Sequence, residues 1–390
     1  MTDEAGRAGR DKTAATRILA VAPFANPHVT CIYDALARQP GLDVVRASLH
    51  ALPARRVVLG WPEMSPRAPY LQPWRRLSDR LALRRELSRA DVAILPGPFH
   101  LGRLPLDFAQ RLALGSGPIL AWSEPFLAYR ERSRANLAML SAIARILDSP
   151  RVQLLSIGDR AIEDYRSLGV RRWSAWSFGF AVEAMERQSR TSPGSPLRIA
   201  FVGELIERKR VDLLLDALAR PELAAAKWIL SIVGDGPERV RLESQAQRLG
   251  IREKLTFGGP QHMDRARQVL QATDVLVLPS RFDGWGAAVN EGLEASAAVV
   301  VSDACGSSRL VEHGRSGLVF RSGDAPDLAR CLASLVADPA RAFEMGHAGH
   351  EAVKAWRPDA IALRLAALCR GLARHGPMPQ FPEGPLVRIP

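Results

Sequence analysis

The stretch 283–291, Asp-Gly-Trp-Gly-Ala-Ala-Val-Asn-Glu, combines two carboxylates with two glycines. Gly284 and Gly286 allow the backbone to approach a ligand closely, and the residues after them are predicted to form a helix whose N-terminal amides can receive a diphosphate. Asp283 in the loop and Glu291 on the helix suit a ligand with two sets of hydroxyls, such as a sugar and a ribose. The alternative is that Asp283 only caps the helix and Glu291 faces solvent.

Three more glycine-bearing loops follow apolar runs in the C-terminal half, at Gly203, at Gly234-Asp235-Gly236 and at Gly258. In an open parallel sheet, ligands bind beyond the carboxyl ends of the strands, so we expect these loops and the stretch 283–291 to meet at one crevice. Each signal alone is weak, because a lone Gly-x-Gly is most often a tight turn.

Short apolar runs, each followed by a turn and a more polar stretch, recur along the chain and predict parallel sheets flanked by helices. The N-terminal half has expected strands at 17–23, 90–96, 118–122 and 152–156 and a helix over about 29–39. The C-terminal half has expected strands at 197–202, 228–233, 254–257, 275–278 and 298–301, then helices near 327–337, 340–355 and 359–374.

The segment 187–196 is rich in Ser, Pro and Gly, which marks a domain boundary. The predicted fold class is therefore α/β, with two parallel-sheet domains in sequence and a cleft between them. We predict the following division: an N-terminal domain at 13–186, the linker at 187–196, a C-terminal domain at 197–356, a separate helix at 357–375 and an irregular, Pro-rich tail at 376–390.

Four segments of the C-terminal half resemble, in order and spacing, the donor domain of glycosyltransferase family 4. They are Phe-Val-Gly-Glu-Leu-Ile-Glu-Arg-Lys at 201–209, Val-Gly-Asp-Gly-Pro-Glu at 233–238, Thr-Asp-Val-Leu-Val-Leu-Pro-Ser at 273–280 and the stretch 283–291. Ser-Asp-Ala-Cys-Gly at 302–306 and His-Gly-Arg-Ser-Gly-Leu-Val-Phe at 313–320 extend the match. The likeness covers roughly 197–355, and the N-terminal half is similar to the family only in its strand and helix layout.

The resemblance implies a GT-B fold of two facing Rossmann-like domains, with the final helix crossing back to the first domain. It implies a retaining hexosyltransferase that needs no metal and no cofactor besides its nucleoside-diphosphate sugar co-substrate, with a UDP-sugar favoured and a GDP-sugar as the alternative. The expected acceptor is a saccharide or a lipid-linked molecule, in the synthesis of surface polysaccharide or glycolipid.

By position, Lys209 matches the family's basic residue that neutralises the diphosphate, Asp283 the acid that contacts the donor sugar and Glu291 the acid that holds the ribose. A cation suits the first role because the leaving nucleoside diphosphate gains negative charge as the glycosidic bond breaks. Alternatively, Lys209 belongs to an ordinary charged surface run. The remaining donor-binding candidates are Gly203, Glu204, Arg208, Gly234, Asp235, Gly236, Gly258, Gly284, Trp285, Gly286 and Ala287.

The chain departs from the family pattern at three positions. Glu204 stands where the family usually has an Arg, so Lys209, with Arg208 or Arg210, must supply the positive charge. Arg210 also replaces a usual glycine. Asp283 in place of Glu keeps the charge but shortens the side chain by one methylene.

Two residues of the N-terminal half are further candidates. The family commonly has a Gly-rich loop after its first strand and a His after a later strand, where this chain has Pro-Phe-Ala-Asn-Pro-His at 23–28 and Trp-Ser-Glu at 122–124. Glu124 is a candidate catalytic residue that orients the acceptor hydroxyl or the sugar, and His28 a candidate acceptor contact. The alternatives are a helix cap for His28 and an ordinary surface acid for Glu124.

The segment 74–89 has six Arg against two acids, with Trp74, Leu77 and Leu81 at helical spacing. It is a candidate amphipathic helix for peripheral contact with an anionic membrane that carries a lipid-linked acceptor. The alternative is a normal helix that buries this apolar stripe and leaves a basic face in solvent.

Most of the formal net charge of +12 lies in the first half, since residues 1–200 hold 29 Lys and Arg against 18 Asp and Glu, a difference of +11. This excess favours an anionic partner. The four cysteines form no CxxC pair, so we expect buried, reduced thiols and no metal site. Without a long apolar run or an apolar leader, we expect a cytoplasmic protein, at the inner face of the cytoplasmic membrane if segment 74–89 contacts it.

Three other functions compete with the transferase. A nucleotide-sugar epimerase on the same fold would form product without an acceptor. A non-catalytic nucleotide-sugar-binding protein is suggested by Glu204, and an anionic-polymer-binding protein by the pI of about 10.3. No nucleic-acid-binding module is recognisable and the basic excess lies opposite the recognised loops, so no nucleic-acid partner is expected.

Overall fold

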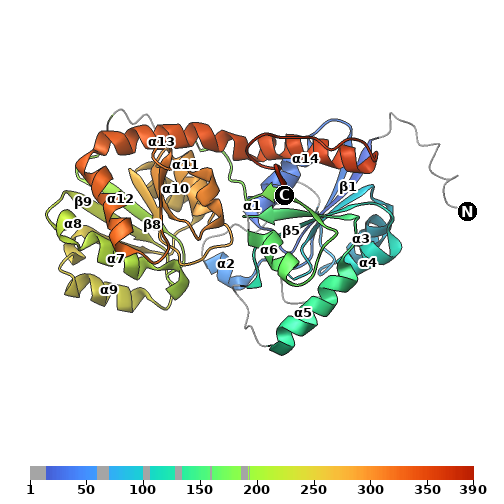
Figure 1. The fold of residues 1–390 in the computed structure, drawn as a ribbon, viewed down its shortest axis with the longest axis horizontal. Helices are drawn as coiled ribbons and strands as arrows, with labels where there is room; N and C mark the ends of the chain where they lie inside the picture. Colours follow the sequence, from blue (N-terminus) through green and yellow to red (C-terminus); the bar gives the residue numbers. More distant parts are fainter. Residues whose placement is uncertain are drawn as a thin grey trace, which may run out of the picture.

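The computed structural model describes residues 15–58, 70–99, 106–127, 134–158, 160–185, 192 and 194–390. It contains two α/β domains side by side, with the helices α13 (Pro339–Val353) and α14 (Pro358–Ala373) running along one edge of both (Figure 1). The predicted fold class is confirmed. The linker predicted at 187–196 lies mostly outside the described residues, and the predicted domain boundaries stay predictions.

The N-terminal domain is built on an eight-stranded sheet in the order β14-β7-β6-β5-β4-β1-β2-β3. Its strands are parallel except for β14, which pairs antiparallel with β7. Their bounds are β1 Thr16–Ala22, β2 Leu42–Ser48, β3 Tyr70–Leu71, β4 Val92–Pro96, β5 Ile119–Ser123, β6 Val152–Ile157, β7 Ser174–Phe178 and β14 Arg388–Ile389. The helices are α1 Pro27–Ala37, α2 Ala54–Val58, α3 Leu77–Arg89, α4 Leu106–Leu114, α5 Arg134–Leu147 and α6 Arg160–Ser167.

Alternate residues of the central strands bury into two separate cores, as the two-residue period of a strand requires. From β1, Ile18 packs with α1 and α14, whereas Leu19 packs with α3, α4, α5 and α6. These four helices therefore cover one face of the N-terminal sheet, and α1 and α14 cover the other.

The C-terminal domain has a six-stranded parallel sheet in the order β10-β9-β8-β11-β12-β13. The strands are β8 Leu197–Val202, β9 Trp228–Val233, β10 Leu255–Gly259, β11 Val275–Leu278, β12 Ala298–Ser302 and β13 Gly317–Phe320. The α-helices before α13 are α7 Val211–Leu218, α8 Pro221–Ala224, α9 Arg239–Arg248, α10 Met263–Gln271, α11 Ala288–Glu294 and α12 Ala325–Ala337. Four 3-10 helices complete it: η2 Glu207–Lys209, η3 Arg252–Lys254, η4 Gly306–Leu310 and η5 Lys354–Trp356.

The predicted return helix is α14, which packs against α1 of the first domain. Pro358 breaks the preceding helix, because a proline cannot donate a backbone hydrogen bond within a helix and is favoured at a helix start. Arg38 of the first domain forms an ion pair with Asp359 at 2.8 Å. The chain therefore leaves the N-terminal domain after β7 and returns to it through η5.

The prediction of an irregular tail over 376–390 was wrong at its end. Strand β14 adds to the edge of β7, where the amide of Leu386 donates to the carbonyl of Ser177 at 2.7 Å. The amide of Val387 donates to the Ser177 hydroxyl at 3.0 Å. These bonds to a distant strand order a segment whose own sequence carries no strand pattern.

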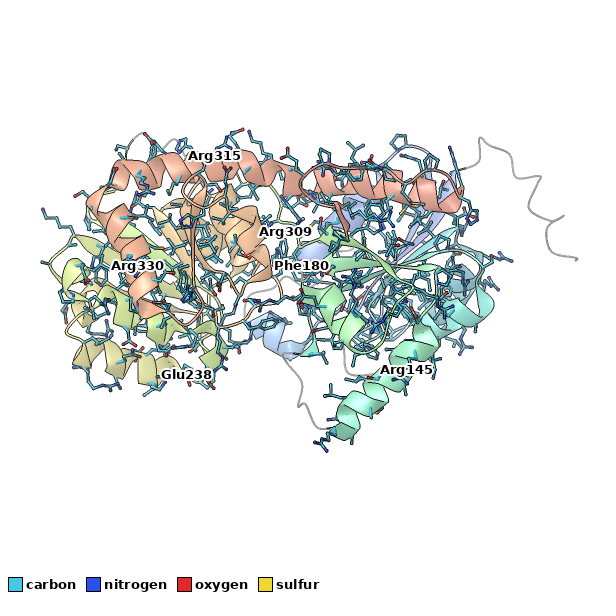
Figure 2. All side chains as sticks on the ribbon, viewed as in Figure 1. Arg145, Phe180, Glu238, Arg309, Arg315 and Arg330 are labelled. Atoms are coloured by element: carbon cyan, nitrogen blue, oxygen red, sulfur yellow. The ribbon has the colours of Figure 1, made fainter. Side chains whose placement is uncertain are left out.

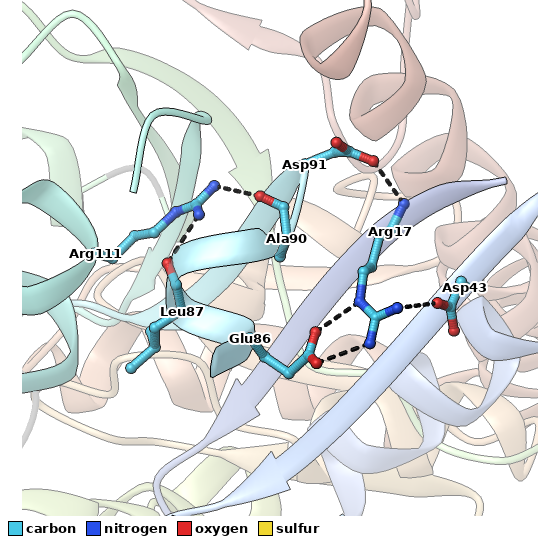
Figure 3. A network of polar contacts seen from close by, with 7 residues as sticks. All are labelled: Arg17, Asp43, Glu86, Leu87, Ala90, Asp91 and Arg111. Carbon is cyan, nitrogen blue, oxygen red and sulfur yellow. Dashed lines mark hydrogen bonds and ion pairs between the residues drawn. The ribbon is translucent and has the colours of Figure 1, made fainter. Parts of the chain in front are cut away.

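The alternative that a helix in segment 74–89 buries the stripe Trp74, Leu77 and Leu81 was wrong, because these side chains are 46%, 70% and 50% exposed. The opposite side of α3 faces the sheet. Glu86 forms a two-bonded ion pair with Arg17 at 2.7 and 2.8 Å (Figure 3).

The buried guanidinium of Arg111, on α4, donates to the carbonyls of Leu87 and Ala90 at the end of α3, at 2.9 and 2.8 Å (Figure 3). These bonds and those of Glu86 fix the orientation of the helix. All four cysteines are free and buried. Within the described residues, no helix is long and apolar enough to span a membrane.

Candidate functional site

A cavity of about 770 Å³ lies between the two domains. The C-terminal domain contributes its strand-end loops and the start of α11, and the N-terminal domain contributes the loops after β1, β4, β5 and β7. Of the residues predicted to bind or act on a ligand, these line it: His28, Glu124, Gly203, Glu204, Arg208, Lys209, Gly234, Asp283, Gly286, Ala287 and Glu291.

The glycine loops of the C-terminal sheet pack on one another at its carboxyl edge. The amide of Gly203 donates to the carbonyl of Val233 at 3.0 Å, and the amide of Gly234 donates to the carbonyl of Gly259 at 2.8 Å. Gly234 has a φ of 135°, and a Cβ built on it would lie 1.9 Å from the Gly203 oxygen. Only glycine allows this close approach.

Backbone hydrogen bonds from the chain around η4 fix the acidic loop at 283–286. The amides of Gly306 and Ser307 donate to the carbonyls of Asp283 and Trp285 at 3.0 and 2.9 Å. The N-cap of α11 is Ala287, which makes no side-chain capping bond, so Asp283 is not a helix cap. Glu291 lies half-buried on the first turn of α11 and lines the cavity, so it does not face open solvent.

Lys209 and Arg208 both reach Asp283. The Lys209 ammonium forms an ion pair with Asp283 Oδ2, and the Arg208 guanidinium lies 3.5 Å from the same oxygen. Burial raises the pKa of Asp283, but the two cations and their hydrogen bonds outweigh it and hold the pKa below its usual range. Lys209 is only 12% exposed, so it is not part of an ordinary surface run.

Arg210 does not line the cavity. Its backbone adopts a left-handed conformation with φ 51°, and its guanidinium binds Asp212 at 3.1 Å. On the C-terminal side of the cavity, the positive charge that Glu204 does not supply therefore comes from Lys209 and Arg208, without Arg210, and Arg56 of the first domain also lines the cavity.

Glu124 reaches the cavity from the loop after β5, so the alternative that it is an ordinary surface acid was wrong. Asp164, on α6, shapes this loop by accepting the amides of Phe126 and Leu127 at 2.7 and 2.9 Å. The Glu124 carboxylate faces Gly284, where a built Cβ would lie 2.7 Å from Oε1. Burial, and then the negative charge of Asp283, raise the pKa of Glu124 to about 7.

Burial also raises the pKa of Glu291 to about 7, against the opposing effect of Arg267. Two of the four carboxylates that line the cavity, Glu124 and Glu291, therefore change charge near neutral pH. Perturbed carboxylates in a cleft are typical of functional sites.

His28 is buried in the first turn of α1 and lines the cavity. Its Nδ1 lies 3.3 Å from the carbonyl of Ala181, and burial lowers its pKa to about 4, so the ring is neutral at pH 7. The alternative that His28 caps the helix was wrong. The N-cap is Asn26, whose side chain accepts the His28 amide at 3.0 Å.

Five predicted donor-binding residues do not line this cavity: Asp235, Gly236, Gly258, Gly284 and Trp285. Gly284 lines an adjoining cavity of about 90 Å³. Gly236 lets two loops pack, since a built Cβ would lie 2.3 Å from the carbonyl oxygen of Leu205. Trp285 is fully buried against the chain connection that leaves the N-terminal domain.

Several lining residues were missed by the sequence analysis: Phe24, Asn26, Arg56, Phe99, Phe126 and Phe180 from the first domain, and Gln261 and Met263 from the second. All except Arg56 follow within a few residues of a strand end. The rule that ligands bind beyond the carboxyl ends of parallel strands would therefore have found them. Arg56, on the short helix α2, has no such signal in the sequence.

The arrangement places two cations, which can bind an anion, beside carboxylates that can bind hydroxyls. Lys209 and Arg208 supply the charge, and Asp283, Glu291 and Glu124 supply the acceptors. In the described ranges, no group of three or more His, Cys, Asp or Glu is placed to hold a metal ion.

Comparison with known proteins identifies the C-terminal half. Residues 182–352 match the family described as glycosyl transferases group 1. A GDP-mannose-dependent alpha-(1-6)-phosphatidylinositol monomannoside mannosyltransferase of Mycobacterium tuberculosis is 34% identical over 195 residues, which cover 48% of this chain and 50% of that protein.

A lipopolysaccharide core biosynthesis glycosyltransferase, LpsE of Rhizobium meliloti, is 31% identical over 170 residues, covering 44% of this chain and 48% of that protein. The chain thus matches the curated relatives over about half of their length.

Solved structures show the likeness of the whole fold. The lipopolysaccharide outer core galactosyltransferase WaaB superimposes with a TM-score of 0.64 at 16% identity, covering 90% of this chain and 98% of that chain. Anabaena HepE in complex with UDP and glucose superimposes with a TM-score of 0.63 at 16% identity over the same shares. Residues 182–352 therefore resemble the group 1 glycosyl transferases, and the whole chain has the GT-B fold, which confirms the predicted resemblance and is consistent with family 4.

Proposed function

We propose that this protein is a retaining, metal-independent hexosyltransferase that moves a sugar from a nucleoside-diphosphate sugar to a saccharide or lipid-linked acceptor in surface polysaccharide or glycolipid synthesis. The observation that carries the proposal is the placement of Lys209 and Arg208 beside Asp283, within one cavity that also contains Glu291 on the first turn of α11.

The diphosphate is proposed to bind between the two cations and the start of α11. In the free protein Asp283 partly neutralises Lys209, and a diphosphate would compete for that cation. As the glycosidic bond breaks, negative charge accumulates on the leaving diphosphate, so Lys209 and Arg208 stabilise the transition state more than the ground state. This charge makes a metal ion unnecessary in the proposed reaction.

The sugar and the ribose are proposed to bind the carboxylates. Asp283 accepts hydrogen bonds from the hydroxyls of the donor sugar, and Glu291 accepts those from the ribose hydroxyls. From the first domain, Glu124 and His28 approach the sugar and the acceptor. Both bases have support among similar proteins, since one relative is described as GDP-mannose-dependent and one similar structure contains UDP. A UDP-sugar remains our first choice.

Thermal melting with a panel of UDP-, GDP- and ADP-sugars tests the donor. A ligand at 100 times its Kd stabilises the folded state by about 2.7 kcal/mol, so one group should raise Tm clearly. Lys209→Ala combined with Asp283→Ala should remove the increase, whereas the exposed Lys227→Ala should keep it. No stabilisation by any nucleotide sugar would contradict the proposal.

We also propose that the first domain contacts an anionic membrane through segment 74–89. Trp74, Leu77 and Leu81 are exposed, and so are all six arginines of the segment: Arg75, Arg76, Arg80, Arg84, Arg85 and Arg89. Helix α5 lies on the same face of the sheet and exposes Met139 and Ile146. Apolar side chains beside exposed cations suit the boundary of an anionic bilayer.

Co-sedimentation with vesicles tests this contact. Vesicles that contain phosphatidylglycerol should bind the protein, and pure phosphatidylcholine vesicles should not. Leu77→Ser with Leu81→Ser and, separately, Arg76→Gln with Arg80→Gln should each reduce binding. Val240→Ser, at an apolar side chain 74% exposed on the other domain, is the matched control. Equal binding to both vesicle types would contradict the proposal.

A further inference from the structure

The two chain connections between the domains both pass Trp285. The outgoing connection begins at Gly179, directly after β7, and the returning connection runs through η5 to α14. A Cβ built on Gly179 would lie 2.2 Å from Cη2 of Trp285, so the indole rests on this backbone. On the return side, the rings of Trp285 and Trp356 lie 5.5 Å apart at 41°.

Hydrogen bonds fix this arrangement from helix α11. Trp285 Nε1 donates to Asn290 Oδ1 at 2.8 Å, and Asn290 Nδ2 donates to the carbonyl of Phe180 at 3.1 Å. One turn further along the helix, the buried Glu294 accepts two bonds from Arg357 at 2.7 and 2.9 Å. Asn290 therefore holds the outgoing connection, and Glu294 holds the returning one.

Side chains from both domains close around this junction. Phe180 and Arg309 lie where the two domains meet (Figure 2), and the Arg309 guanidinium lies 5.8 Å from the ring centroid of Trp356. Ala181 donates its amide to the carbonyl of His28 at 3.1 Å, which ties the outgoing connection to α1. The junction is therefore built from both domains and from the loop that carries Asp283.

Trp285 lies between Asp283 and Glu291 in sequence, yet it does not line the cavity. Both connections are covalent links between the domains. A side chain that touches both is therefore placed to couple the relative orientation of the domains to the loop that carries Asp283, opposite Glu124 of the first domain.

We infer that Trp285 is a positioning residue that sets the width of the cleft by fixing the acidic loop to both domain connections. The inference rests on the proposed function for its meaning in catalysis. It goes further in naming the side chain that links the geometry of the donor loop to the angle between the domains.

A compensating pair of substitutions tests it. Gly179→Ala places a methyl group where the indole lies and should force the connection away from Trp285. Trp285→Phe removes the ring atoms that contact Gly179, so the double variant should accommodate the methyl and return toward wild type. Gly376→Ala is the matched control, because a built Cβ there meets nothing within 4 Å.

The readout is fluorescence energy transfer between dyes on Ile146→Cys in α5 and Val240→Cys in α9, which are 79% and 74% exposed on different domains. The four natural cysteines are buried and leave the labelling specific. Gly179→Ala should shift the interdomain distance distribution of the free protein and weaken UDP binding about tenfold. The double variant should recover both, and Trp285→Phe alone should broaden the distribution.

An unchanged distribution in Gly179→Ala, or a double variant as displaced as Gly179→Ala, would overturn the inference. If Gly179→Ala does not fold, Trp285→Phe decides, because an unchanged distribution width in that variant also overturns it. The distance measurement needs no ligand, so it stays decisive even if UDP fails to bind, an outcome that would contradict only the proposed function.

Discussion

Four carboxylates line the cavity, and the surroundings of three of them, Asp283, Glu124 and Glu291, shift their pKa values in different directions. Lys209 and Arg208 hold the pKa of Asp283 low, so this group stays negative across the physiological range. Burial raises the pKa values of Glu124 and Glu291 to about 7. Near neutral pH Asp283 thus stays charged while Glu124 and Glu291 titrate, which makes ligand binding dependent on pH.

Glu291 should bind the ribose best as a carboxylate, because hydrogen bonds to a charged acceptor are the stronger ones. The affinity for UDP-glucose should therefore rise severalfold between about pH 6 and pH 8, as Glu291 loses its proton. In Glu291→Gln, the part of this increase in affinity that comes from the deprotonation of Glu291 should be absent. Isothermal titration of both proteins with UDP-glucose checks it, and identical pH profiles would contradict the ribose role.

The same shift affects the stability of the free protein. Because the pKa of Glu291 is raised from 4.5 to about 7 on folding, the folded state binds more protons than the unfolded state in this window. Stability contributed by the protonated group is full below the unfolded pKa and is lost as the pH rises through the folded pKa. As the pH rises from about 4.5 to about 7, the Tm of Glu291→Gln should therefore fall less than the Tm of wild type. An equal fall in both proteins would argue against the buried position of Glu291.

Glu124 should matter for the reaction and little for donor affinity, because it faces the sugar end from the other domain. Glu124→Gln keeps the shape and removes the titrating charge. We expect its kcat to fall about 100-fold, within the range typical of a lost acid or base, with the Kd for UDP changed less than threefold. Steady-state kinetics with titration of UDP separates the two, and full activity would remove Glu124 from the mechanism.

The loops that carry the site residues keep their shape because other residues form hydrogen bonds with their backbone. Asp164, on α6, accepts two backbone amides of the loop that carries Glu124. Asp164→Ala should cost about 2 kcal/mol of unfolding free energy, since it leaves two amides without a charged acceptor. Denaturant unfolding checks this, with Asp359→Ala as control, because its exposed ion pair should contribute less than about 0.5 kcal/mol.

If Asp164 orders the loop, kcat should fall in Asp164→Ala while UDP still binds. Unchanged stability and kcat would mean that the loop keeps its shape without this residue.

Local patterns determined the strands whose apolar runs end at a glycine or a proline. Strands β8, β9 and β11 have the predicted bounds, because each is a mostly apolar run followed directly by Gly203, Gly234 or Pro279. Strand β7 was missed, since its sequence Ser-Ala-Trp-Ser-Phe interrupts the apolar run, and it is stabilised by pairing with β6. The edge strand β14 depends wholly on its distant partner β7, which no local pattern encodes.

The candidate site was also predictable only where its residues carry a local signal in the sequence. The loop after Asp283 and the cations before it carry signals of type and spacing, and the structure brings them together. Trp285 was assigned to the ligand because of its neighbours, but its side chain turns to the domain connections, which is a tertiary effect. The aromatic wall of the cavity, formed by Phe24, Phe99, Phe126 and Phe180 of the first domain, carries no motif, and only the position of these residues after strand ends points to the site.

At the scale of the whole molecule, the two domains divide the work. The C-terminal domain carries the recognised motifs and most of the charged residues that line the cavity, whereas the N-terminal domain carries the basic excess, the exposed face of α3 and the aromatic wall. The helices α13 and α14 connect them along one edge (Figure 1). Donor chemistry and acceptor delivery thus belong to different domains in the proposed function.

The most direct test of the central claim is a crystal structure of the protein with UDP, or with GDP if melting favours it. The account predicts a diphosphate within hydrogen-bond distance of Lys209 and Arg208, at the start of α11, with the ribose on Glu291. A well-ordered nucleotide outside the cavity between the domains, or a diphosphate that touches neither cation, would contradict it.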